Sequence, residues 1–230
     1  MIRLALQLEE QRDAYLAAAS RIAEVVIHEG HPEAIISDRV PVASSSLPVL
    51  LVGGVADNAF PALPWRFSPQ ARSIRASVDA GDLGRPGLLR LHVWESAEIS
   101  HADKVGAIDL VLWLFGAVPT AIHGRPGLAH LGFAEGGMAM IDFHDRLPPG
   151  EGYRSLSLIG SEGAAYADDH HDRNLIFAGG APRASPPDTG DHFRQAMLED
   201  FIAKVRQGTS PAETLTAYRE AERIVLEAGA

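Results

Sequence analysis

Residues 107–115 constrain the fold most strongly, because they are apolar on nearly every side of a helix. The segment reads Ala-Ile-Asp-Leu-Val-Leu-Trp-Leu-Phe, and Asp109 is its only polar side chain apart from the indole. A helix that is apolar around most of its circumference belongs in a core. Gly116 and Pro119 follow, as is typical after a helix C-terminus. A carboxylate inside such a helix costs free energy unless another group pairs with it, so we expect a polar partner for Asp109.

Length and composition predict a globular protein. The chain has 230 residues, 46% of them hydrophobic, which is enough for one large domain or for one domain and a small one. The formal net charge of -10 argues against nucleic acid or an anionic membrane as a partner, since both require a basic surface. The absence of cysteine excludes disulfides, thiolate metal sites and a cysteine nucleophile. Without a signal peptide or an apolar run of about 18 residues, a cytoplasmic protein is expected.

The N-terminal part has the pattern of a small parallel unit. Residues 2–6 and 24–27 are short apolar runs typical of buried strands, and residues 9–23 between them carry apolar side chains at helical spacing. This order predicts an opening βαβ unit. Residues 34–36 and 48–52 are further strand candidates.

The rest of the chain predicts a mainly antiparallel open sheet packed by helices. Ser68 and Pro69 mark the start of a helix that stops at Gly81. Residues 89–94 alternate as a half-buried strand does. Further strands are expected at residues 120–123, 128–133, 138–144, 153–159 and 164–167, with 175–177 as another candidate. A surface loop over residues 179–190 precedes an amphipathic helix from Phe193 to Phe201 and a final helix that opens at Ser210-Pro211.

Five segments occur in order between residues 60 and 228. They are Trp65-Arg66-Phe67-Ser68-Pro69, Ala80-Gly81-Asp82-Leu83-Gly84, Ile108-Asp109 through Gly116 and Pro119, Leu158-Ile159-Gly160-Ser161-Glu162-Gly163, and Phe193 to Phe201 with the terminal helix. Together they resemble the C-terminal domain of the Gfo/Idh/MocA oxidoreductases, the glucose-fructose oxidoreductase and inositol dehydrogenase family. The resemblance implies an α/β (α+β) fold with an N-terminal dinucleotide-binding domain and a C-terminal sheet that carries the substrate pocket and often an oligomer interface. We therefore expect a truncated Rossmann-like unit over residues 1–60 and a substrate and oligomerisation domain over residues 61–230.

The expected nucleotide site departs from the family. The family's first strand leads into a glycine-rich turn, because glycine lets the backbone approach a pyrophosphate at a helix N-terminus. Here residues 7–11 read Gln-Leu-Glu-Glu-Gln, with no glycine and two carboxylates. The chain is also shorter than the family norm by on the order of 100 residues, and the intact C-terminal matches place that deletion in the nucleotide domain.

The family's proton-transfer groups are also missing in register. The catalytic lysine of the Glu-Lys-Pro motif has as its nearest equivalent Asp38-Arg39-Val40-Pro41, and arginine exchanges protons poorly. Counting back from Asp109, Gly106 stands at the position of the family's histidine and Ala102 at that of its aspartate. His101 and Asp103 flank Ala102, so a shifted register is the alternative.

The candidate catalytic residues are Asp109, His101 and Asp103, and the candidate substrate-binding residues are Arg66 and Trp94. Each also has a structural interpretation. Asp109 is either a polar anchor in the substrate pocket or a buried carboxylate that ties its helix to an arginine such as Arg66 or to backbone N–H groups. His101 is either catalytic or an exposed residue near a helix start, and Trp94 lines either a ligand or the core.

Three other motifs carry little functional weight. The run from Asp168 to Asp172 contains metal-ligand residue types but is more typical of a solvated acidic turn. His28-Glu29-Gly30-His31 lacks the spacing of a helical zinc motif. Gly53-Gly54 is either a phosphate loop or, more typically, a turn. We predict no metal site.

Two functional hypotheses follow. The first is a non-catalytic homologue that keeps the substrate-domain sheet and binds a ligand or a partner subunit. The second is a working dehydrogenase that uses NAD or NADP on a sugar or polyol, with hydride transfer done by the cofactor. In both cases we expect a homodimer or tetramer formed through the sheet, since an antiparallel sheet commonly leaves one face to be covered.

Overall fold

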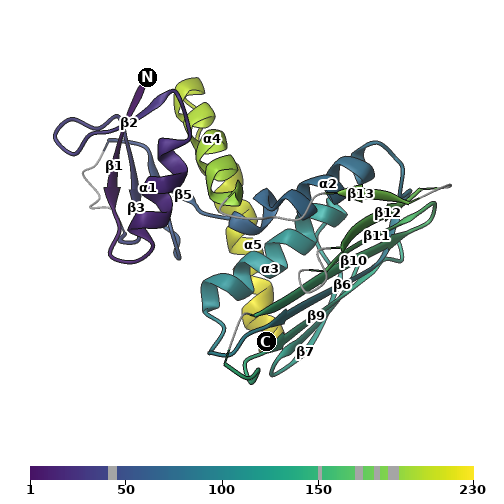
Figure 1. Ribbon diagram of the computed structural model, residues 1–230. Helices are drawn as coiled ribbons and strands as arrows, with labels where there is room; N and C mark the ends of the chain where they lie inside the picture. Colours follow the sequence, from purple (N-terminus) through teal and green to yellow (C-terminus); the bar gives the residue numbers. More distant parts are fainter. Residues whose placement is uncertain (41–45, 150–151, 169–172, 179–181, 186–191) are drawn as a thin grey trace. The chain divides into compact units, whose positions relative to one another are not determined.

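The computed structural model describes residues 1–40, 46–149, 152–168, 173–178, 182–185 and 192–230. The chain forms two compact units (Figure 1). Unit 1 comprises residues 1–67 and 189–219, and unit 2 comprises residues 68–188 and 220–230. The last helix, α5 (Ala212–Ala228), therefore contributes to both units.

Unit 1 is built on a parallel sheet. Its strands are β1 (Ile2–Gln7), β2 (Val25–Ile27), β3 (Ala34–Ser37), β4 (Val49–Leu51) and β5 (Phe60–Pro61), in the spatial order β2-β1-β3-β4-β5. Every pairing between them is parallel, which confirms the predicted βαβ opening. Helix α1 (Arg12–Ser20) joins β1 to β2 and is shorter than the predicted 9–23. Among the described residues, no other helix lies between consecutive strands of this sheet.

Both faces of the parallel sheet are buried, as is usual for parallel strands. On one face, Leu4 and Ile36 pack with Tyr15 of α1 and Phe201 of α4 (His192–Gln207). The other face carries a smaller cluster: Ala5, Ile35, Val49, Leu51 and Ala59. The sequence pattern groups residues 192–207 with the second domain, whereas in the structure this helix lies in unit 1, because its apolar stripe covers the parallel sheet.

Unit 2 is built on an eight-stranded sheet. Its strands are β6 (Pro86–Trp94), β7 (Ala121–Arg125), β8 (Leu128–Gly132), β9 (Met138–His144), β10 (Tyr153–Gly160), β11 (Ala164–Asp168), β12 (Arg173–Phe177) and β13 (Arg183–Ser185). Their spatial order is β13-β12-β11-β10-β6-β9-β8-β7. Only the central pair β6·β9 is parallel among these strands, so the predicted mainly antiparallel sheet is confirmed.

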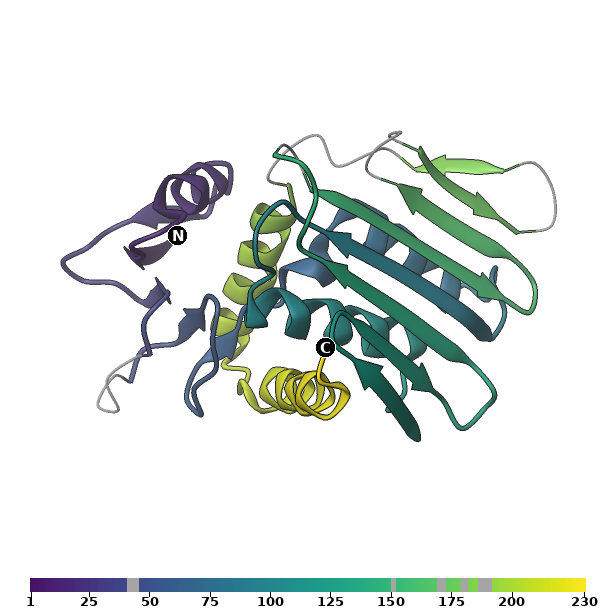
Figure 2. The same ribbon diagram turned by 90° about the horizontal axis from the view of Figure 1, so that it is seen from below.

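The helices of unit 2 cover one face of this sheet (Figures 1 and 2). Helix α3 (His101–Phe115) packs on β6 and β9, and α2 (Pro69–Asp79) packs on β12 and β13. We call the other side of the sheet the open face, because no helix of the unit lies on it in either view. Along β6 the buried side chains Leu89, Leu91 and Val93 point to the helices, so Arg90, His92 and Trp94 point to the open face.

Helix boundaries follow the predicted signals. The Ser68 hydroxyl accepts the N–H of Ala71 at 3.2 Å, and α2 ends just before Gly81 at φ 78°. Helix α3 ends at Gly116, which has the left-handed φ of 64°. The predicted loop over 179–190 is wrong for residues 183–185, which pair with β12 as an edge strand.

Candidate functional site

The three candidate catalytic residues lie on α3, but at different places along it. Ser100 caps the helix start: its Oγ accepts the Asp103 N–H at 3.1 Å and donates to Asp103 Oδ2 at 2.7 Å. His101 is half-exposed, and its Nε2 lies 3.4 Å from Glu222 Oε1. Asp109 lies about 12 Å further along the axis than His101, at about 1.5 Å per residue. The helix therefore does not gather the three side chains at one point.

Asp109 is the one charged residue of the described chain that is completely buried, with 0% exposure. Its neighbours along the helix, Ile108 and Leu110, are also buried, as the apolar run predicts. The carboxylate takes part in a polar interaction, so it is not an isolated charge. Gly106 and Ala102 occupy the two positions at which the family resemblance places a proton-transfer pair.

The two candidate substrate-binding residues lie in different units. Arg66 belongs to the 3₁₀ helix Pro64–Phe67 of unit 1 and is itself engaged in an interaction. Trp94 ends β6 on the open face of unit 2, where its Nε1–H donates to Asp142 Oδ2 at 3.0 Å. The Trp94 ring also lies 5.3 Å from the ring of Tyr153 and 6.0 Å from that of His144, measured between centroids.

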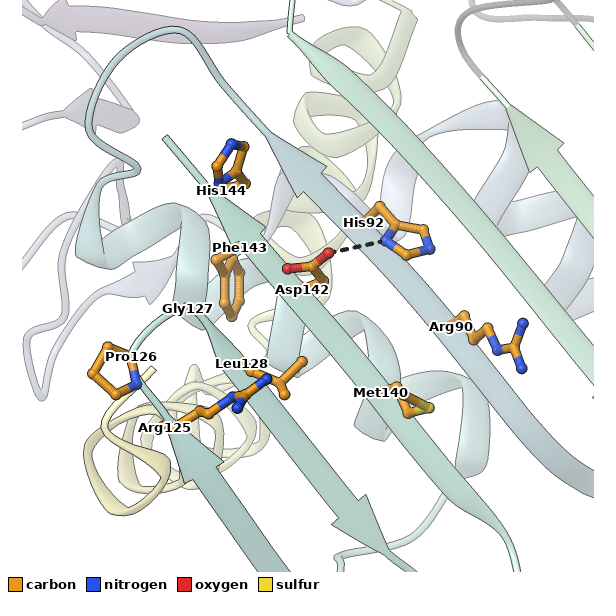
Figure 3. Close-up of a pocket in the computed structure, with 10 residues that line it drawn as sticks. All are labelled: Arg90, His92, Arg125, Pro126, Gly127, Leu128, Met140, Asp142, Phe143 and His144. Atoms are coloured by element: carbon orange, nitrogen blue, oxygen red, sulfur yellow. Dashed lines mark hydrogen bonds and ion pairs between the residues drawn. The ribbon is translucent and has the colours of Figure 1, made fainter. Parts of the chain in front are cut away.

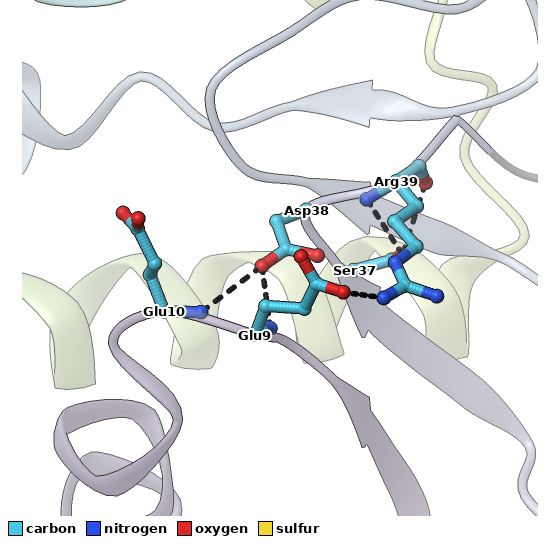
Figure 4. Close-up of polar contacts among 5 residues, drawn as sticks. All are labelled: Glu9, Glu10, Ser37, Asp38 and Arg39. Atoms are coloured by element: carbon cyan, nitrogen blue, oxygen red, sulfur yellow. Dashed lines mark hydrogen bonds and ion pairs between the residues drawn. The ribbon is translucent and has the colours of Figure 1, made fainter.

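Polar residues gather where β1 and β3 end, at the carboxyl edge of the parallel sheet (Figure 4). In open α/β sheets this edge is where ligands bind. Here Asp38 Oδ2 accepts the backbone N–H groups of Glu9 at 2.6 Å and of Glu10 at 3.3 Å. Arg39 forms an ion pair with the Glu9 carboxylate, and its backbone N–H donates to Ser37 Oγ at 3.1 Å. A carboxylate of the chain thus takes the backbone donors that follow β1.

The charge at this edge is negative. Glu9, Glu10 and Asp38 carry three carboxylates, and Arg39 is the one cation among the residues in this close-up. Asp38 Oδ1 is shielded from solvent and has no hydrogen-bond partner among the described residues. A phosphate group placed here would meet like charge and would find the nearby N–H groups already engaged.

A second concentration of polar side chains lies on the open face of unit 2 (Figure 3). It surrounds a cavity of about 370 Å³, which we call the open-face pocket. The pocket is lined by Arg90, His92, Arg125, Pro126, Gly127, Leu128, Met140, Asp142, Phe143 and His144. Its volume falls within the range of small-molecule sites, about 300–1,000 Å³.

Strand register explains why these residues meet. Cross-strand pairing aligns His92 with Asp142, Asp142 with Leu128, and Leu128 with Arg125, which makes one row across β6, β9, β8 and β7. The turn between β7 and β8 is Pro126-Gly127, with Gly127 at φ 81°. The Gly127 carbonyl accepts the Phe143 N–H at 2.8 Å, which holds the turn against β9.

Cationic groups dominate the open-face pocket. Its one carboxylate, Asp142, accepts the Trp94 indole N–H and lies 3.4 Å from His92 Nδ1. In the part of the chain that the structure describes, Arg90 and Arg125 have neither an ion-pair partner nor a side-chain hydrogen bond. The pocket therefore offers two unpaired guanidinium groups to a ligand.

The metal-like motifs find no support in the described residues. Residues 169–172 of the acidic run lie outside them. Within the described ranges, no group of three His, Asp or Glu side chains is arranged to hold a metal ion. His28 and His31 contact each other, with the His31 N–H donating to His28 Nδ1 at 3.1 Å. No helix of the described chain is long and apolar enough to cross a bilayer.

Solved structures of dehydrogenases share this architecture. A myo-inositol dehydrogenase from Corynebacterium glutamicum superposes with a TM-score of 0.71 at 14% identity, over 99% of this chain and 96% of that chain. A dehydrogenase from Chromobacterium violaceum gives 0.73 at 12% identity, over 100% and 96%. A levoglucosan dehydrogenase in complex with NADH gives 0.72 at 12% identity, over 99% and 96%. At these identities the likeness shows the fold alone. No family model and no curated protein sequence matches the chain.

Sequence reasoning singled out Trp94, which donates to the pocket residue Asp142, but named none of the residues that line the open-face pocket. A signal was present in two strands whose exposed positions are polar: Arg90 and His92 in β6, and Asp142 and His144 in β9. Nothing in the sequence showed that these strands are parallel neighbours, because two strands and a helix separate them along the chain.

Proposed function

We propose that this protein is a non-catalytic relative of the dehydrogenases that share its fold, and that it binds a ligand or a partner without using NAD or NADP. The observation that carries the proposal is the Asp38 carboxylate, which accepts the N–H groups of Glu9 and Glu10. These are the donors that a pyrophosphate would need at the end of the first strand. Asp38 takes the place of that anion, so the residues at this edge do not fit a dinucleotide.

The small size of unit 1 supports the same proposal. In the described chain, α1 is the only helix between consecutive strands of its parallel sheet. Segments of six residues (28–33) and eight residues (52–59) make the connections from β2 to β3 and from β4 to β5. A full parallel βαβ unit uses a helix for each such crossover. These short connections support the proposal that unit 1 is a reduced form of a nucleotide-binding unit.

The lack of a proton-transfer pair also supports it. General acid–base catalysis needs a titratable group within hydrogen-bond reach of the substrate hydroxyl. Gly106 and Ala102 have none, and the carboxylate of the neighbouring Asp103 accepts the hydroxyl of Ser100, the N-cap of α3. His101 points to Glu222 instead.

The competing function is an active NAD- or NADP-dependent dehydrogenase of a sugar or polyol. The fold favours it, because a neighbour of similar architecture is a levoglucosan dehydrogenase in complex with NADH. In that case Asp38 would have to release the N–H groups of the β1–α1 turn, and Asp109, His101 or Asp103 would move the hydroxyl proton.

Calorimetric titration of the full chain with NAD⁺, NADH, NADP⁺ and NADPH separates the two functions. The proposal predicts no binding up to millimolar concentration. A dissociation constant below about 100 μM, which corresponds to about 5.5 kcal/mol, would overturn it. Asp38→Ala is the matched variant: it frees the two N–H groups but leaves Glu9 and Glu10, so we expect it to remain unable to bind nucleotide.

We also propose that the chain self-associates through the open face. Exposed apolar side chains line one end of this face: Met138, Ile159, Tyr166 and Phe177. Pairing places Met138, Leu88 and Ile159 in one row across β9, β6 and β10. Burial of such a patch favours association. Sedimentation velocity should show a dimer or tetramer that Ile159→Lys weakens, and a concentration-independent monomer would contradict the proposal.

A further inference from the structure

The open-face pocket carries unpaired positive charge in a protein that is acidic as a whole. The chain has 30 acidic and 20 basic residues. Several of its arginines form ion pairs with carboxylates, as Arg154 does with Glu95. Arg90 and Arg125 have none among the described residues. Two guanidinium groups that line one cavity and are not paired with its single carboxylate, Asp142, are suited to an anionic ligand, because arginine binds carboxylate and phosphate through paired N–H donors.

The separation of the two arginines indicates the size of that ligand. Arg125 lies on β7, which is the third strand from β6 in the sheet. Its cross-strand row reaches β6 at His92, two residues along that strand from Arg90. With about 4.8 Å between strands and about 3.4 Å per residue, their Cα atoms are about 16 Å apart. Both residues line the pocket; in Figure 3 the Arg125 side chain extends toward Leu128, whereas the Arg90 side chain extends away from Arg125. An anion with acid groups at both ends fits this spacing better than a single phosphate ion.

The pocket floor suits the middle of such a molecule. Figure 3 shows Met140 and Leu128 between the two arginines, and both are partly buried apolar side chains. Asp142 lies on the same floor, but its carboxylate is held by the Trp94 N–H and lies against His92, which reduces its repulsion of an anion. A carbon chain can therefore pack on the floor while its ends reach the arginines.

We propose that the open-face pocket binds a small dicarboxylate, with one carboxylate on Arg90 and the other on Arg125. The site lies wholly within unit 2 and does not involve the carboxyl edge of the parallel sheet. It therefore does not depend on whether unit 1 binds a nucleotide.

Calorimetry on the full chain at low ionic strength tests this proposal with malonate, succinate and glutarate as probes. Acetate and inorganic phosphate are the comparison ions. We expect at least one dicarboxylate to bind at least tenfold more tightly than acetate and phosphate. Arg90→Gln and Arg125→Gln should each weaken that binding tenfold or more. Arg85→Gln is the matched control, since it removes the same charge from an exposed position outside the pocket.

A spectroscopic readout places the ligand. The chain has three tryptophans, and the Trp94 indole N–H donates to the pocket residue Asp142. Its ¹H–¹⁵N signal should shift on dicarboxylate addition, while those of Trp65 and Trp113 should not. Three results would overturn the proposal: no dicarboxylate binding at millimolar concentration, equal weakening by Arg85→Gln, or arginine variants that change only the sedimentation of the protein. The last result would assign the arginines to contacts with a second copy of the chain.

Discussion

Alkaline pH should destabilise unit 1 through the buried phenol of Tyr15. The residue is 2% exposed, and burial raises the pKa of Tyr15 from 10.0 to about 12, although the nearby Arg194 guanidinium lowers it. The folded state therefore favours the protonated phenol. In the unfolded chain the phenol ionises near its ordinary pKa, so stability is complete below about pH 10 and falls as the pH rises toward 12.

The size of the effect follows from the shift. Each pKa unit is equivalent to about 1.36 kcal/mol, so a shift from 10.0 to about 12 costs about 1.4 kcal/mol at pH 11 and about 2.3 kcal/mol at pH 12. Urea unfolding of the wild type and of Tyr15→Phe, at about pH 8 and about pH 11, measures it. Phenylalanine keeps the ring in place and has no proton to lose. The free energy of unfolding of the wild type should therefore fall by about 1.4 kcal/mol more than that of the variant.

The comparison between variants removes the effect of other titrating groups. Tyr166→Phe serves as the control, because that side chain belongs to a residue that is 44% exposed, and its replacement should leave the pH dependence unchanged. If wild type and Tyr15→Phe lose the same stability between the two pH values, burial does not hold the phenol protonated and the reasoning is refuted.

Three further variants, one of them with a control variant, test the packing and the buried carboxylate. Phe201→Ala should cost about 3–5 kcal/mol, because it leaves a cavity in the core of unit 1, whereas Leu226→Ala at a 70% exposed position should cost less than about 0.5 kcal/mol; urea unfolding compares them. Gly160→Ala should lower the melting temperature clearly, since a Cβ there would lie 1.9 Å from the Leu83 carbonyl oxygen. An unchanged melting temperature would mean that the end of β10 and the turn before β6 are not so close. Asp109→Ala should cost at least about 2 kcal/mol by leaving its polar partner unsatisfied; a neutral result in urea would show that the buried carboxylate has no structural role.

The candidate site was only partly predictable. The carboxylates after the first strand were visible as Glu9 and Glu10, and their conflict with a phosphate follows from charge alone. That Asp38 bonds to their N–H groups depends on β1 and β3 being parallel neighbours, a pairing between segments about 30 residues apart. The contact of His101 is likewise with a residue distant in the sequence, Glu222 of the last helix.

The elements were predictable wherever the signal is local. The Ser68 cap, the glycine stops, the buried helix around Asp109 and the alternation of β6 all depend on residues within one or two turns of each other, and all are confirmed. The open-face pocket is different. Arg90 and Arg125 line the same pocket only because four strands take a spatial order that differs from their order in the chain. Local preference decides which segments become helix or strand, whereas the position of one strand beside another depends on burying both in a shared core. The sequence by itself therefore determined the elements, and only the tertiary structure decided which polar groups face one another.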